Sequence, residues 1–125
     1  MDLKFYVCSH CGNIIVKIKD AGVPVMCCGQ KMTEIVAGSV DAAHEKHVPV
    51  VEKNGNNVLV KVGDVAHPMI PEHFIQWIVV QTNAGYQIKY LNAGELPQAN
   101  FVLADGEEVV AVYAHSSAAF GGISA

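Results

Sequence analysis

The sequence predicts an all-β protein in which a small metal-bound module precedes an antiparallel β-sandwich. Three observations lead to this fold class. All four cysteines lie within the first 28 residues. Short Val-rich stretches alternate with Asn, Asp and Gly turns through the rest of the chain, and helical periodicity is absent from every long window. We therefore expect a metal domain at residues 1–37 and a β-sandwich domain at residues 38–125.

The first domain is defined by Cys8, Cys11 and the adjacent pair Cys27-Cys28. Two thiolate pairs brought together on tight turns form a tetrahedral four-sulfur site, which selects zinc or iron. Two disulfides are the alternative, but the N-terminal residues do not resemble a secretory signal and cytosolic thiols stay reduced. Apolar runs at residues 4–7, 13–18 and 31–36 predict short strands. So few residues cannot bury a sufficient core without a metal.

The second domain contains six stretches that we predict as strands: residues 48–52, 57–62, 74–82, 87–91, 100–103 and 108–115. Turn signals such as Asn54-Gly55-Asn56 and Asp105-Gly106 separate them. Their spacing favours a sandwich of antiparallel strands over a parallel sheet. Trp77 is the one tryptophan and falls in the longest apolar stretch, so we expect it in the core.

Composition excludes several classes of partner. Apolar residues make up 51% of the 125-residue chain, and the formal net charge is -4. The eight basic residues are all lysines and are scattered, so no basic stripe for nucleic acid is present. No apolar run approaches the roughly 20 residues that span a bilayer. We expect a cytoplasmic protein without nucleic-acid or membrane partners.

Histidines in the second domain suggest another metal site. Three of them adjoin predicted strands: His47, His67 and His73. Pro68 and Pro71 restrict the turn between the last two. Converging imidazoles would bind a divalent ion, whereas a single loop histidine is usually only a solvated or hydrogen-bonded side chain. We interpret His10 and His44 as solvent-facing.

The chain resembles the desulfoferrodoxin form of superoxide reductase in these segments, taken in order: Cys8-x-x-Cys11, Cys27-Cys28-Gly29, Glu45-Lys46-His47-Val48-Pro49, His67-Pro68-Met69 and His73-x-x-x-Trp77. The resemblance implies a desulforedoxin-like first domain with one iron on the four cysteines. It also implies an immunoglobulin-like β-sandwich that binds a second iron through His47, His67 and His73. The implied reaction is one-electron reduction of superoxide to hydrogen peroxide, by a homodimer that receives electrons from a small redox donor such as a rubredoxin-like protein.

The resemblance also assigns roles to Glu45 and Lys46. Superoxide is a small anion, so a lysine at the mouth of a site would attract it electrostatically. By resemblance Lys46 takes this role, with Glu45 beside it. The alternative interpretation is a solvated charge pair.

The chain departs from the family pattern near its C-terminus. The family closes its catalytic iron with a Cys-Asn-x-His-Gly segment, which supplies the axial thiolate and a fourth histidine. Aligned from Val109-Val110 and Tyr113, the cysteine position is Ala114 and the histidine position is Ser117. His115 is a weaker candidate ligand, because a one-residue offset turns a strand side chain to the other face. We interpret His115 as a terminal surface histidine.

Three functional hypotheses follow. The first is a superoxide reductase whose catalytic iron site is altered by Ala114 and Ser117, since axial ligand identity tunes redox potential. The second is a non-catalytic electron-transfer or metal-binding protein that uses the four-cysteine iron alone. The third is a structural protein with zinc in the four-cysteine site and an empty histidine site. Four thiolate ligands do not reveal whether the bound metal is iron or zinc. At the second site, three histidines could hold iron or another divalent ion.

Overall fold

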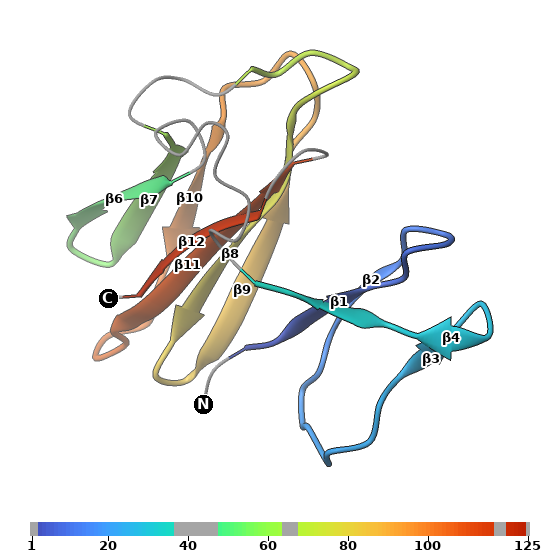
Figure 1. Cartoon of the computed structure of the whole chain (residues 1–125). Coiled ribbons are helices and arrows are strands. Elements are labelled where there is room, and N and C mark those ends of the chain that lie inside the picture. Colours follow the sequence, from blue (N-terminus) through green and yellow to red (C-terminus); the bar gives the residue numbers. More distant parts are fainter. Residues whose placement is uncertain (1–2, 37–47, 64–67, 117–119, 125) are drawn as a thin grey trace. The chain divides into compact units, whose positions relative to one another are not determined.

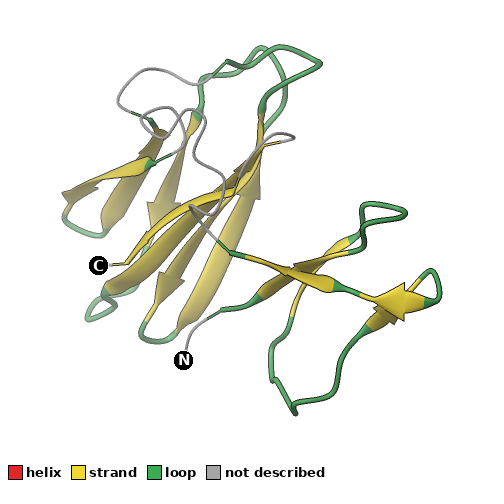
Figure 2. Ribbon diagram, in the orientation of Figure 1, coloured by secondary structure: helices red, strands yellow, loops and turns green. Residues whose placement is uncertain are grey.

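The structure is a computed structural model that describes residues 3–36, 48–63, 68–116 and 120–124. The chain divides into two compact units, Met1–Val36 and Ala37–Ala125. Every strand pair is antiparallel, and the described residues contain strands but no helix (Figures 1 and 2). The predicted all-β class is confirmed.

The Met1–Val36 unit contains two small sheets. The first has the order β2-β1-β5 and consists of β1 (Phe5–Val7), β2 (Ile14–Val16) and β5 (Thr33–Ile35). The second is a hairpin of β3 (Met26–Cys27) and β4 (Gln30–Lys31), which the sequence did not predict. Within the described part of this unit the buried apolar side chains are Leu3, Phe5, Cys8 and Met32. Such a small core agrees with the expectation that the unit needs further support.

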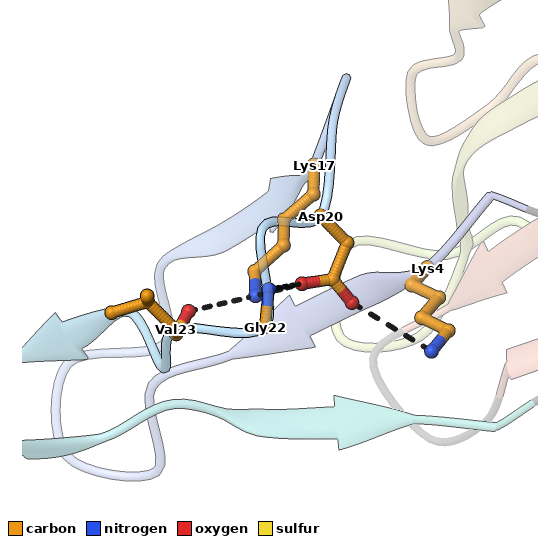
Figure 3. A network of polar contacts seen from close by, with 5 residues as sticks. All are labelled: Lys4, Lys17, Asp20, Gly22 and Val23. Atoms are coloured by element: carbon orange, nitrogen blue, oxygen red, sulfur yellow. Dashed lines mark hydrogen bonds and ion pairs between the residues drawn. The ribbon is translucent and has the colours of Figure 1, made fainter.

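A network of polar contacts closes the loop between β2 and β3 (Figure 3). The Lys17 Nζ lies 3.1 Å from Asp20 Oδ1 and donates to the Val23 carbonyl oxygen at 3.0 Å. The Gly22 N–H donates to the same Asp20 oxygen at 2.9 Å, and the Lys4 Nζ lies 3.7 Å from the other. The Gly22 N–H and then the Lys17 ammonium hold the pKa of Asp20 below its ordinary value. The loop that leads to the second cysteine pair is therefore tied to Lys4, which precedes β1, and to Lys17, which follows β2.

Replacing Asp20 by Asn should loosen this loop at neutral pH. Because the pKa of Asp20 is lowered by folding, its carboxylate stabilises the loop above the ordinary pKa of about 3.9, and this is lost as pH falls through the lower folded pKa. Hydrogen exchange of the Gly22 amide in zinc-loaded protein should therefore be faster in D20N than in wild type at pH 7, where the cysteines keep their metal. E34Q, which removes an exposed carboxylate from the same unit, is the control. Equal exchange rates in D20N and wild type at pH 7 would contradict the prediction.

The Ala37–Ala125 unit is built from two antiparallel sheets. One has the order β10-β7-β6 and consists of β6 (Pro49–Asn54), β7 (Asn57–Val62) and β10 (Gln98–Val102). The other has the order β12-β11-β8-β9 and consists of β8 (Ile75–Thr82), β9 (Gly85–Tyr90), β11 (Val109–Ser116) and β12 (Phe120–Ser124). The six predicted stretches coincide with β6 to β11 to within a few residues. β12 was not predicted, because Gly121 and Gly122 interrupt any strand-like pattern.

Alternating side chains of the two sheets form one core. In β7 the valines at positions 58, 60 and 62 are buried, whereas the residues between them are less so. They belong to a cluster that draws on both sheets: Val58, Val60, Val62, Ile75, Ile78, Val80, Ala99, Phe101, Leu103, Val112 and Ala114. Two facing sheets around one apolar layer make a β-sandwich, as predicted. Trp77 is also buried, with 7% of its surface exposed.

Side chains of β9 close one edge of the sandwich. The Gln87 Nε2 donates to the Val102 carbonyl oxygen at 3.0 Å, and the Lys89 Nζ donates to the Asn100 carbonyl oxygen. Both acceptors lie on β10, which ends the other sheet. The Lys89 Nζ also lies 5.3 Å from the centre of the Phe101 ring. An edge covered in this way is a poor template for pairing with another chain.

Candidate metal centre

The first cysteine pair lies on a tight turn between β1 and β2. The Cys8 N–H donates to the Asn13 carbonyl oxygen and the Gly12 N–H to the Cys8 carbonyl oxygen, both at 2.8 Å. Gly12 has a φ of 84°, a left-handed conformation that glycine adopts without a steric penalty. Within the turn the Cys11 N–H approaches Cys8 Sγ to 3.5 Å. The backbone thus points a hydrogen-bond donor at the first sulfur.

The second cysteine pair lies on the turn of the β3–β4 hairpin. Cys27 pairs with Gln30, which leaves Cys28 and Gly29 as a two-residue loop. Both loop residues have positive φ, 51° and 73°, as in a type I′ turn. Adjacent strand residues normally point to opposite faces, and the left-handed Cys28 breaks this alternation. This conformation costs a non-glycine residue roughly 1–2 kcal/mol, and it allows both sulfurs to reach one point.

The two turns bring all four sulfurs together. The Sγ atoms of Cys8, Cys11, Cys27 and Cys28 lie within 4.8 Å of one another, and those of Cys11 and Cys27 are 3.6 Å apart. Four sulfurs about 2.3 Å from a central ion would form a tetrahedron with edges of roughly 3.8 Å. The donor set therefore fits one four-coordinate metal ion. Among the described residues, this is the group of Cys, His, Asp and Glu side chains that could hold one.

The four thiols differ in burial and in acidity. Cys8 is buried, whereas Cys11 and Cys28 are exposed. The Cys11 backbone N–H lowers the pKa of Cys8 to about 6, while the neighbouring thiols of Cys11 and Cys8 raise the pKa of Cys28 to about 12. The pKa of Cys27 is raised as well, first by Cys8. A single thiolate on Cys8 thus disfavours a second negative charge, and a cation supplies the charge that would allow the others to ionise.

Most residues of the predicted histidine site lie outside the described part of the chain. These are Glu45, Lys46, His47, His67 and the Ser117 position, together with His44. His73 is described and is half-buried. Its backbone exchanges two hydrogen bonds with Ile70, of 3.0 and 3.1 Å, which fixes the turn before β8. Convergence of the three histidines stays a prediction.

Ala114 and His115 lie on opposite faces of β11. Ala114 pairs with Ile78 and packs in the sandwich core, with 2% of its surface exposed. His115 pairs with Trp77 and stacks on its ring, with ring centres 5.2 Å apart and an angle of 7° between planes. The one-residue offset therefore reverses the side chain, as expected.

The interpretation of His115 as a terminal surface histidine is wrong. β11 continues through Ser116 and lies between β8 and β12 in the sheet. His115 is therefore a half-buried residue of an inner strand. Its Nδ1 lies 3.2 Å from Gln76 Oε1, and burial lowers the pKa of the imidazole. No group of three metal-binding side chains that includes His115 occurs among the described residues.

Comparison with known proteins identifies the family. Residues 39–123 match the desulfoferrodoxin family. The chain belongs to this family. Desulfoferrodoxin of Syntrophotalea carbinolica is 43% identical over 111 residues, which cover 89% of this chain and 88% of the relative. Desulfoferrodoxin of Nitratidesulfovibrio vulgaris is 42% identical over 108 residues, covering 86% of this chain and 85% of the relative.

Two solved superoxide reductases are similar in structure to this chain. The superoxide reductase from Treponema pallidum superposes with a TM-score of 0.82 at 35% identity, covering 98% of this chain and 99% of that one. The superoxide reductase from Giardia intestinalis has a TM-score of 0.54 at 26% identity, and the match covers 63% of this chain and 95% of that one.

No helix in the described part of this desulfoferrodoxin-family chain is long and apolar enough to cross a membrane.

Two polar residues of the cysteine turns escaped the sequence reasoning. The Asn13 Nδ2 lies 3.7 Å from Cys27 Sγ, and the Gln30 Nε2 donates to Ser9 Oγ at 2.8 Å. Each side chain reaches from one cysteine turn to the other. The sequence offers only a weak signal for these contacts, which is that each amide residue directly follows a Cys-Gly pair.

Proposed function

We propose that this chain is an iron protein that reduces superoxide to hydrogen peroxide, with a catalytic site altered at Ala114 and Ser117. The observation that carries the proposal is the superposition, over 98% of the chain, on the superoxide reductase from Treponema pallidum. Each turnover takes one superoxide, one electron and two protons to one hydrogen peroxide. The electron would come from a small redox donor such as a rubredoxin-like protein.

In this proposal the Met1–Val36 unit is the desulforedoxin-like domain. Its four cysteines hold one iron in a closed tetrahedral set, which suits storage or relay of an electron because no position is open to substrate. Support comes from the sulfur spacing that fits such an ion. Zinc would fit the same donors.

The Ala37–Ala125 unit is proposed to hold the catalytic metal through His47, His67 and His73. Iron there would supply the electron that superoxide accepts. Lys46 would draw the anion toward the site, with Glu45 beside it. A homodimer and a cytoplasmic location follow from the family resemblance and remain predictions.

A second function is favoured by the environment of Ala114. Its methyl group is a core side chain without a donor atom, so it cannot supply the axial thiolate that tunes the family's iron. The chain would then be a non-catalytic electron-transfer or metal-binding protein that uses the four-cysteine iron alone.

Superoxide kinetics distinguish these two functions. We expect the iron-loaded chain to consume superoxide faster than the metal-free chain, and the double variant A114C/S117H to be faster still, because it restores both missing ligands. A111C is the matched control, since Ala111 is a buried alanine on the opposite face of β11. A wild-type rate equal to that of the metal-free chain would reject catalysis. The electron-transfer function would then still predict a reversible thiolate-to-iron absorption band in a variant with His47, His67 and His73 replaced by Ala.

A further inference from the structure

Asn13 extends from the first cysteine turn to a sulfur of the second. Its Nδ2 lies 3.7 Å from Cys27 Sγ. The start of the side chain is fixed, because the Asn13 carbonyl oxygen accepts a 2.8 Å hydrogen bond from the Cys8 N–H and β2 begins at the next residue. The contact therefore links the two halves of the cysteine cluster through an exposed side chain whose backbone is held in place.

The chemistry of this contact has one favourable orientation. A cysteine that binds a metal is a thiolate and can only accept hydrogen bonds. The amide must then present its NH₂ group rather than its oxygen to Cys27. Hydrogen bonds to the sulfurs of iron–thiolate centres tune their reduction potentials, and groups just outside the ligand set orient the ligands themselves.

We propose that Asn13 is a positioning residue that holds the Cys27 thiolate in place and raises the reduction potential of iron bound by the four cysteines. This inference rests on the proposed iron site. A reduced four-thiolate iron centre carries one more negative charge than the oxidised centre. The Asn13 N–H group therefore stabilises the reduced state more strongly, and its loss favours oxidation.

The chain supplies a matched control in the same two turns. The Gln30 Nε2 donates to Ser9 Oγ at 2.8 Å, so it also joins the second turn to the first. No sulfur takes part in that bond. Q30A thus removes a link of the same kind between the turns and leaves the sulfur hydrogen bonds intact, which separates a structural contribution from an electronic one.

The test is an optical redox titration of the iron-loaded full-length chain in wild-type, N13A, N13D and Q30A forms. N13A should lower the midpoint potential, N13D should lower it further because a carboxylate repels the thiolate, and Q30A should match wild type. Zinc affinity, measured with a competing chelator, should fall roughly 10-fold or more in N13A and N13D. Loss of iron uptake in N13D but not in Q30A would also support the positioning role.

Two outcomes overturn the inference. Wild-type potentials in both N13A and N13D, with iron still bound, would reject the role of Asn13 and leave the proposed iron site intact. A wild-type chain that takes up neither iron nor zinc on its cysteines would reject the iron site and the role of Asn13 together. Neither outcome depends on a measurement of superoxide kinetics.

Discussion

Removing the metal from the four cysteines is expected to unfold the Met1–Val36 unit. The buried apolar side chains described in this unit are Leu3, Phe5, Cys8 and Met32, too few to offset the entropy of ordering such a chain. Structural zinc sites contribute about 10–16 kcal/mol in small metal-dependent domains.

Amide NMR spectra of the zinc-loaded chain before and after chelation would measure this effect. Signals from β1, β2 and β5 should collapse to unfolded positions, while those from the sandwich, which has its own core, should remain dispersed. C8S should behave like the chelated protein. H10A, which removes an exposed side chain from the same turn, should keep its metal and its spectrum. Dispersed signals from β1 after complete metal removal would contradict the prediction.

Replacing Phe101 by Ala is expected to destabilise the sandwich by about 3–5 kcal/mol. Phe101 has 0% of its surface exposed and lies in the core cluster with residues of both sheets. Its truncation leaves a cavity that close-packed neighbours fill only in part. The Lys89 Nζ, which lies over the ring, would also lose its aromatic contact.

Chemical denaturation monitored by Trp77 fluorescence would measure this loss. V102A is the matched control, because Val102 is the next residue of β10 and is 61% exposed. We expect V102A to change the free energy of unfolding by no more than about 0.5 kcal/mol, as is usual at the surface. Equal effects of the two substitutions would show that β10 does not present its Phe101 face to the core.

The sandwich was predictable because its strands carry a strong local signal. β7 reads as alternating valines, and Asn54-Gly55-Asn56 marks the turn that joins it to β6. β12 has no such signal and forms because β11 offers it an edge to pair with. The β3–β4 hairpin is similar, since it consists of four paired residues around a turn with a left-handed cysteine. Pairing that depends on a distant partner leaves little trace in local sequence.

For the candidate sites, residue type and spacing carried only part of the information. Cys-x-x-Cys and Cys-Cys-Gly were sufficient to predict a four-sulfur cluster, because few geometries place four thiols on two tight turns. The error at His115 arose because nearness to the C-terminus was taken as exposure, whereas β12 folds back beside it. Its contacts with Trp77 and Gln76 join positions about 38 residues apart, which no local pattern reveals.

From its residues alone, this chain was identifiable as an all-β desulfoferrodoxin-family protein with four cysteines grouped for a metal. Those properties depend on residue identity and on short-range spacing, which the sequence states directly. Only the tertiary structure placed the Asn13 amide against Cys27 Sγ at 3.7 Å and put Ala114 and His115 on opposite faces of β11. Those contacts join separate turns and strands, so they exist only after distant segments have paired and packed.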